Sequence, residues 1–228
     1  MRPYFERVTG RPLRAGMKVM LQVRAQFHPL YGFSWIVEDI NPEYSLGDMM
    51  RHRQEILRIL KEEGVIDLNK QISMPDFAQR IAVVSSETAA GYGDFKNQLE
   101  HNERGLKFVT RLFPATMQGE TVEASIIEAL NAIFDEADHF DVVVIIRGGG
   151  AVADLSGFDS LALAENVANF PLPIITGIGH ERDESVIDFV SHMRVKTPTA
   201  AAAFLIDHLE TTDDKVMSAQ DFVAHYAK

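Results

Sequence analysis

Three segments of the sequence combine reactive side chains with glycine. They are Ser85-Ser86-Glu87-Thr88, Arg147-Gly148-Gly149-Gly150 and Gly179-His180-Glu181-Arg182-Asp183. Arginine can bind a phosphate through two parallel hydrogen bonds, and successive glycines let backbone amides approach an anion closely. Histidine titrates near neutral pH, so it can move a proton when a carboxylate orients its ring. These residue types therefore indicate an anion-binding site that is capable of acid–base chemistry.

Each segment follows a short apolar run that is typical of a buried parallel strand. Amphipathic helices are predicted between these runs. The expected order is strand 81–84, helix 88–103, strand 107–113, helix 120–138, strand 142–146, helix 158–169, strand 173–178 and helix 184–192. This alternation predicts an α/β fold with an open, mostly parallel, doubly wound sheet. Because the carboxyl ends of parallel strands share one edge and form the ligand crevice, we expect the three segments to meet there.

An antiparallel hairpin is predicted before this domain, because residues 17–27 and 33–40 alternate apolar and polar around a turn at 28–32. Two strands alone are marginal in water, so the hairpin either packs on the following domain or is the tail of a β-barrel. Its aromatic side chains either stack on nucleic-acid bases or form the hairpin's own core. They are Phe27, Tyr31, Phe33 and Trp35.

Two further helices are expected outside the sheet. The first covers residues 46–64, with Ser45 as its N-cap and Gly64 at its end, and residues 65–79 form a linker. The second begins behind Thr197 with Pro198 in its first turn and is still amphipathic at residue 228. We interpret it as the start of a longer helical region, and the chain as a fragment at both ends.

The composition narrows the class of protein. The 228 residues include no cysteine, which excludes disulfides, thiolate metal sites and cysteine nucleophiles and suits a reducing cytoplasm. No apolar run reaches the roughly 18 residues of a membrane span, so a cytoplasmic protein without a membrane partner is predicted. The net charge of −11 argues against a nucleic-acid partner, because phosphate-binding proteins usually have a basic surface. Residues 1–24 weaken this objection, since they carry six basic side chains and one acidic side chain.

Standard motifs are missing from the sequence. It contains no dinucleotide fingerprint, Walker A loop, GxSxG elbow, HExxH helix or CxxC pair. Its carboxylates and histidines are scattered and match no strong metal-ligand spacing, so no metal ligand is assigned. The residues alone leave two alternatives: a hydrolase, or a non-catalytic nucleotide- or phosphate-binding module.

Three longer stretches resemble the large subunits of the exodeoxyribonuclease VII family. They are RIAVVSSETAAGYGDFKNQL, DVVVIIRGGGAVADLSGFD and PLPIITGIGHERDESVIDFVSHMRVKTPTAAAAFL. That family degrades single-stranded DNA to short oligonucleotides and combines an OB-fold, a catalytic domain and a helical region that binds a small helical subunit. The resemblance implies an OB-fold remnant at 1–45, a helix and linker at 46–79, a catalytic domain at 80–203 and the start of the helical region at 204–228.

The resemblance also assigns roles to residues. By motif it implies that Asp94, Arg147, His180 and Asp183 are catalytic. We expect the substrate to contact Ser85, Ser86, Thr88, Gly148, Gly149 and Gly150. The sequence departs from the family pattern at Glu87 and Ala89, where members often have proline and glycine. The family's activity need not depend on a divalent ion, so no cofactor is expected to be required, with Mg²⁺ left open. The implied partners are single-stranded DNA and the small subunit.

Overall fold

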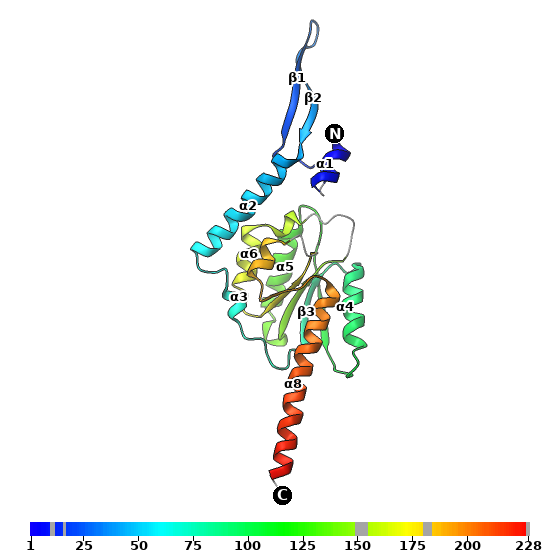
Figure 1. Cartoon of the computed structure of the whole chain (residues 1–228), viewed down its shortest axis with the longest axis vertical. Coiled ribbons are helices and arrows are strands. Elements are labelled where there is room, and N and C mark those ends of the chain that lie inside the picture. The colour runs from blue at the N-terminus through cyan, green and yellow to red at the C-terminus, as the bar shows by residue number, and fades with distance from the viewer. Residues whose placement is uncertain (10–11, 16, 149–154, 180–183, 227–228) are drawn as a thin grey trace. The chain divides into compact units, whose positions relative to one another are not determined.

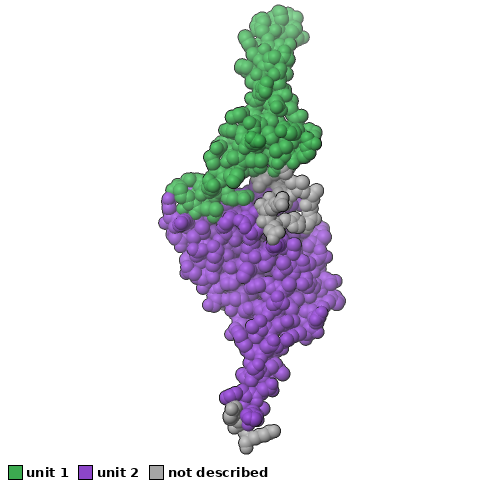
Figure 2. All heavy atoms as spheres, viewed as in Figure 1, with its two compact units in different colours: residues 1–58, 151–154 green, residues 59–150, 155–228 purple. Residues whose placement is uncertain are grey.

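The computed structural model describes residues 1–9, 12–15, 17–148, 155–179 and 184–226. The chain divides into two compact units, with a boundary between Arg58 and Ile59 (Figure 2). The two units are described separately below, and one helix, residues 42–62, contributes residues to both.

The first unit is built on an antiparallel hairpin of β1 (Met20–His28) and β2 (Gly32–Asn41), as the alternating pattern predicts. Gly32 supplies the positive φ of 74° at the turn. A short helix, α1 (Arg2–Thr9), precedes the hairpin and was not predicted from the sequence.

The hairpin's aromatic side chains form no buried core among the residues that the structure describes. Phe27 is 64% exposed, Tyr31 83%, Phe33 75% and Trp35 70%. The rings of Phe27 and Phe33 meet edge to face, 5.4 Å apart, on the surface. These side chains are therefore accessible to a partner.

The helix after the hairpin, α2 (Pro42–Glu62), starts earlier than predicted. The side-chain oxygen of Asn41 accepts hydrogen bonds from the backbone amides of Glu43 (2.9 Å) and Tyr44 (3.2 Å), so Asn41 caps the helix and Pro42 opens it. The prediction that Ser45 is the N-cap is wrong, because its hydroxyl donates to the carbonyl of Lys18 instead. Gly64, with φ 73°, follows the end of the helix as expected.

The second unit contains a five-stranded sheet in the order β4-β3-β5-β6-β7, and all its strand pairs are parallel. The predicted α/β fold class is confirmed. The strands are β3 (Arg80–Ser85), β4 (Val109–Pro114), β5 (Val142–Ile146), β6 (Ile174–Gly177) and β7 (Met193–Arg194), and β7 was not predicted. The helices are α3 (Leu68–Gln71), α4 (Ala90–Glu100), α5 (Val122–Phe134), α6 (Leu161–Ala168), α7 (Val186–Val190) and α8 (Pro198–Tyr226).

Most helices are shorter than the periodic pattern suggested, because local hydrogen bonds set their ends. The hydroxyl of Ser160 accepts a hydrogen bond from the amide of Leu163, so α6 begins at Leu161, and residues 156–158 form a separate 3₁₀ turn. Another 3₁₀ turn at residues 137–139 follows α5, where a continuous helix to 138 was expected.

Helices cover both faces of the sheet (Figure 1). On one face α4 packs against α8, and on the other α5, α6 and α7 lie side by side. Every residue of β5 is buried. The core beneath α4 and α8 includes alternate strand residues such as Val83, Val144 and Ile175.

The strand order reverses between β3 and β5. From β3 the chain first crosses to β4 on one side, and then continues through β5, β6 and β7 on the other. Ligands of open α/β sheets bind outside the carboxyl ends of the strands at such a switch point. Here that position lies beyond Ser85 and Ile146, whose strands pair in register from Ile81 opposite Val142.

An ion pair joins β3 and β5 at their amino-terminal ends, away from the switch point. The carboxylate of Asp141 accepts hydrogen bonds from the backbone amides of Gln79 (3.0 Å) and Arg80 (2.8 Å) and from the Arg80 guanidinium. Burial alone would raise the pKa of Asp141, but these bonds and the Arg80 charge outweigh it and hold the pKa below its usual value.

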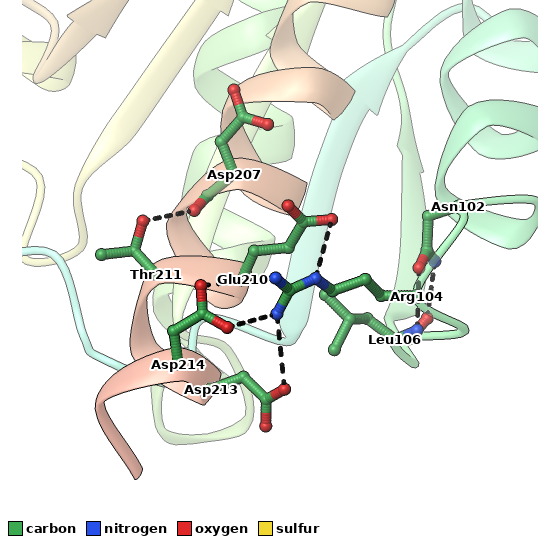
Figure 3. A network of polar contacts seen from close by, with 8 residues as sticks. All are labelled: Asn102, Arg104, Leu106, Asp207, Glu210, Thr211, Asp213 and Asp214. Atoms are coloured by element: carbon green, nitrogen blue, oxygen red, sulfur yellow. Dashed lines mark hydrogen bonds and ion pairs between the residues drawn. The ribbon is translucent and has the colours of Figure 1, made fainter. Parts of the chain in front are cut away.

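Helix α8 is tied to the loop between α4 and β4 by one arginine (Figure 3). Arg104 donates to Asp214 at 2.6 Å and lies within 4 Å of carboxylate oxygens of Glu210 and Asp213. The loop holds its shape because Asn102 exchanges hydrogen bonds of 2.8 Å with the backbone of Leu106. No helix within the described part of the chain is both long and apolar enough to cross a membrane.

The segment expected to be a linker contains α3, whose Asn69 is fully buried. The Asn69 amide nitrogen donates to the carbonyls of Phe170 (3.1 Å) and Leu172 (2.9 Å). Its oxygen accepts from the amides of Ile174 and His192, both at 2.9 Å. One side chain therefore joins α3, the start of β6 and the start of β7.

Replacing Asn69 with alanine removes all four hydrogen bonds and leaves buried backbone groups without this partner. Since each such group costs about 1–3 kcal/mol, we expect the free energy of unfolding to fall by at least about 3 kcal/mol. Urea unfolding at 25 °C measures this change. The control is Asn166→Ala, which removes one exposed bond to Ala162 and should change stability by less than about 0.5 kcal/mol. Equal effects of the two substitutions would contradict the assigned role.

Candidate functional site

At the switch point, backbone segments from three parts of the second unit lie in close contact. A Cβ added to Gly91 in α4 would lie 3.0 Å from the carbonyl oxygen of Arg147 and 3.0 Å from the Cα of Gly148. It would also lie 2.8 Å from Cγ of Pro198, the first residue of α8. Only glycine fits at position 91 without moving its neighbours.

Gly148 completes this contact from the other side. A Cβ built on it would lie 3.1 Å from the Cβ of Ala89 and 3.4 Å from the backbone nitrogens of Ala90 and Gly91. The loop after β3 and the loop after β5 therefore touch, as expected for strands that share an edge.

The start of α8 closes the same edge beside β6. A Cβ on Gly177 would lie 3.1 Å from the carbonyl oxygen of Thr197, and the amide of Arg147 donates to the carbonyl of Gly177 at 3.3 Å. Thr197 caps α8 by accepting a hydrogen bond from the amide of Ala200. The next two residues, Ala201 and Ala202, are fully buried, because small side chains allow α8 to lie close against the sheet.

The first turn of α4 presents backbone amides at this edge. Its N-cap residue is Ala89, which has no side chain to cap the helix, and the first turn contains no acidic residue. Unsatisfied amides and the positive end of the helix dipole favour an anion at such a position. A Cβ built on Gly148 would lie 3.4 Å from the amide nitrogens of Ala90 and Gly91, so Gly148 marks where the two loops meet.

The predicted site residues differ in their exposure. Arg147 is only 5% exposed. Ser85 is fully buried, and its hydroxyl has no hydrogen-bond partner among the described residues. Ser86 and Thr88 lie nearer the surface, with their hydroxyl oxygens 3.4 Å apart.

Asp94 is exposed on α4, three residues after Gly91. Residues at this spacing lie on the same side of a helix, with Cβ positions about 5–6 Å apart. Helical side chains lean toward the N-terminus of their helix, which directs Asp94 toward the turn that contacts Gly148. The remaining predicted residues, Gly149, Gly150, His180 and Asp183, lie outside the described residues.

No group of three or more His, Asp or Glu side chains suitable for a metal ion occurs within the described ranges.

One residue near this edge, Arg194, was not predicted from the sequence. Arg194 ends β7, and its Nη1 donates to Oε1 of Glu184. A strand of two residues is too short to show a periodic pattern, so Arg194 could not be assigned to the sheet from its sequence context.

The contact at Gly91 leads to a prediction about stability. Gly91→Ala should lower the free energy of unfolding by about 1–3 kcal/mol, because the added methyl group meets backbone atoms that cannot move aside easily. Gly93 is the matched control on the same helix, since a Cβ there meets nothing within 4 Å. Gly93→Ala should be neutral or raise stability by about 0.5–1 kcal/mol. Denaturant unfolding of both variants tests this, and an unchanged Gly91→Ala protein would refute the close contact.

Comparison with known proteins identifies the family. The family model described as "Exonuclease VII, large subunit" matches residues 65–228. The chain is 40% identical over 200 residues to the exodeoxyribonuclease 7 large subunit of Deinococcus radiodurans, covering 87% of this chain and 48% of that protein. It is 40% identical over 156 residues to the corresponding protein of a Nostoc species, covering 68% and 37%. It is 31% identical over 190 residues to that of Clostridium botulinum strain Hall, covering 83% and 46%.

The chain spans about half the length, or less, of these relatives. The match nevertheless includes all strands of the parallel sheet and the helices that cover it. The chain belongs to the exonuclease VII large-subunit family.

Proposed function

We propose that the chain carries the catalytic domain of a single-strand-specific exodeoxyribonuclease, which hydrolyses phosphodiester bonds of single-stranded DNA to short oligonucleotides. The observation that carries this proposal is the contact between Gly148, next to Arg147, and the uncapped first turn of α4, at the switch point of a sheet in this family. Anions bind at such positions because backbone amides and a guanidinium converge.

In this proposal Arg147 and the glycine amides stabilise the transition state. Attack on a phosphodiester concentrates negative charge on the non-bridging oxygens, and fixed donors are most effective when water is excluded. The burial of Arg147 supports this role, because charge interactions are stronger away from bulk solvent. Ser86 and Thr88 would bind the adjoining part of the strand. Ser85 was also expected to contact the substrate, but its side chain is fully buried, so it would instead shape the loop beneath them.

Proton transfer is assigned to His180. Oxygen of a water molecule attacks phosphorus, the bond from phosphorus to the leaving oxygen breaks, and a proton from the water ends on the leaving group. His180 would move that proton, and either Asp183 or Asp94 would orient its ring. Gly149 and Gly150 would add amides to the phosphate site. No step requires a divalent ion, and an ion such as Mg²⁺ is compatible with the site.

The remaining parts of the chain are proposed to bind partners. The exposed aromatics of the β1–β2 hairpin would stack on bases, in an OB-fold-like module at residues 1–45. The distal part of α8, within residues 204–228, would lead into the region that binds the small helical subunit. We place the protein in the cytoplasm, which agrees with a chain that has no cysteine.

The test uses the full gene product assembled with the small subunit and end-labelled single-stranded DNA, with and without chelator. We expect cleavage by the unaltered protein, and losses of at least about 100-fold in kcat for both Arg147→Ala and His180→Ala. Arg111→Ala and His139→Ala are matched controls, since both residues are exposed and pair with Glu136.

Two results would contradict the proposal. DNA binding without any cleavage by the intact complex would favour a non-catalytic phosphate-binding module. Undiminished cleavage by His180→Ala would remove the proposed proton carrier.

A further inference from the structure

The start of α8 lies against two glycines that belong to different elements. A Cβ built on Gly91 in α4 would lie 2.8 Å from Cγ of Pro198. A Cβ built on Gly177 at the end of β6 would lie 3.1 Å from the carbonyl oxygen of Thr197. Contacts this close leave no free space beside either glycine. Residues 197–198 are therefore packed against both α4 and β6.

The same two glycines hold the central peptide of the proposed phosphate site. The Cβ position of Gly91 lies 3.0 Å from the carbonyl oxygen of Arg147 and 3.0 Å from the Cα of Gly148. The carbonyl of Gly177 accepts a hydrogen bond of 3.3 Å from the amide of Arg147. Closely packed interiors transmit small displacements, so a shift at the start of α8 would reach the Arg147–Gly148 peptide through Gly91 and Gly177.

The side chain of Thr197 fixes the start of α8. Its Oγ1 accepts a hydrogen bond of 3.1 Å from the amide of Ala200 and lies 2.9 Å from Oγ1 of Thr199. Its carbonyl oxygen accepts the hydrogen bond of 3.1 Å that the amide of Ala201 donates. Pro198 follows with a backbone angle that its ring restrains. Because the capping bond sets where the helix begins, it also sets where the Thr197 carbonyl and the Pro198 ring lie.

The rest of α8 is held to the second unit by other contacts. Ala201, Ala202 and Leu205 are fully buried in the core, and Arg104 binds the helix farther along its length. The helix would therefore stay in place without the cap, but its first turn would lose the bond that sets its conformation. A displacement of about 1 Å near a reacting group can lower a rate by about 100-fold. Loss of the cap can therefore affect catalysis more than stability.

We propose that Thr197 is a positioning residue of the phosphate site. By capping α8 it holds Pro198 against Gly91, and so keeps the first turn of α4 beside the Arg147–Gly148 peptide. This inference rests on the proposed nuclease function, because it assigns a role in that reaction. It requires the Thr197 hydroxyl to act as a cap, and it requires no contact between that hydroxyl and the DNA.

Cap variants of the full gene product, assembled with its small subunit, test this role. Thr197→Val removes the capping oxygen and keeps the shape of the side chain, whereas Thr197→Ser keeps the cap. Steady-state cleavage of single-stranded DNA gives kcat and KM, and thermal unfolding gives Tm. We expect Thr197→Val to lower kcat about tenfold, as a sub-ångström displacement would, with KM within about twofold of the unaltered value. Thr197→Ser should keep kcat within about twofold.

The matched control is Ser160→Ala. Ser160 caps α6 by accepting a hydrogen bond of the same length, 3.1 Å, from the amide of Leu163. Helix α6 packs with α5 and α7 on the face of the sheet opposite α8. Loss of either cap should lower Tm by no more than about 2–4 °C. Only Thr197→Val should lower kcat, and Ser160→Ala should keep it within about twofold.

Four results would overturn the proposal. Unchanged kcat in Thr197→Val would show that the cap serves the helix alone. Equal losses of kcat in Thr197→Val and Ser160→Ala would show a general effect of stability. A raised KM with unchanged kcat in Thr197→Val would show that the hydroxyl binds DNA directly. Thr197→Ser as slow as Thr197→Val would show that the cap is not what matters. Absence of cleavage by the unaltered protein is a separate outcome, which removes the nuclease function and this role with it.

Discussion

The contact between Gly91 and the Arg147–Gly148 peptide is the constraint on which the site depends. It brings the loop after β3 against the loop after β5, and Pro198 adds the start of α8 to the same point. Because a Cβ at Gly91 would lie 2.8 Å from the Pro198 ring and 3.0 Å from two backbone atoms, any larger residue at this position would force the three segments to shift. The result is a helix N-terminus, a buried arginine and a glycine loop on one edge of the sheet.

Polar contacts elsewhere in the second unit hold the strands and helices that form this edge. The Asp141–Arg80 pair joins β3 and β5 at their amino-terminal ends, and Asn69 joins the starts of β6 and β7. Arg104 secures α8 farther along its length. Burial of the apolar core supplies most of the free energy that stabilises the fold. The polar contacts fix the register between strands and helices. Loops mounted on such a scaffold can keep reactive groups in a fixed arrangement.

The sequence predicted the central strands well, because buried parallel strands are continuous apolar runs. Residues 142–146 were assigned with the bounds that β5 has in the structure. The predicted helix ends were less accurate, since they are decided by one or two hydrogen bonds that the side chains of Asn41 and Ser160 accept from backbone amides. Strand β7 has two residues and no periodicity, and the role of Asn69 depends on partners more than 100 positions away. For the site, sequence placed Arg147 and Gly148 at the sheet edge, while Glu184 and Arg194 required the three-dimensional arrangement.

The central claim is that the phosphate of the DNA lies where the two loops meet. A structure of the full gene product with a single-stranded oligonucleotide made resistant to cleavage by phosphorothioate linkages tests this directly. We predict a phosphate within about 3 Å of the Arg147 guanidinium and of a backbone amide of the Gly148 loop or the first turn of α4. A strand bound only at the β1–β2 hairpin or at the opposite edge of the sheet, with no phosphate beside Arg147, would contradict the account.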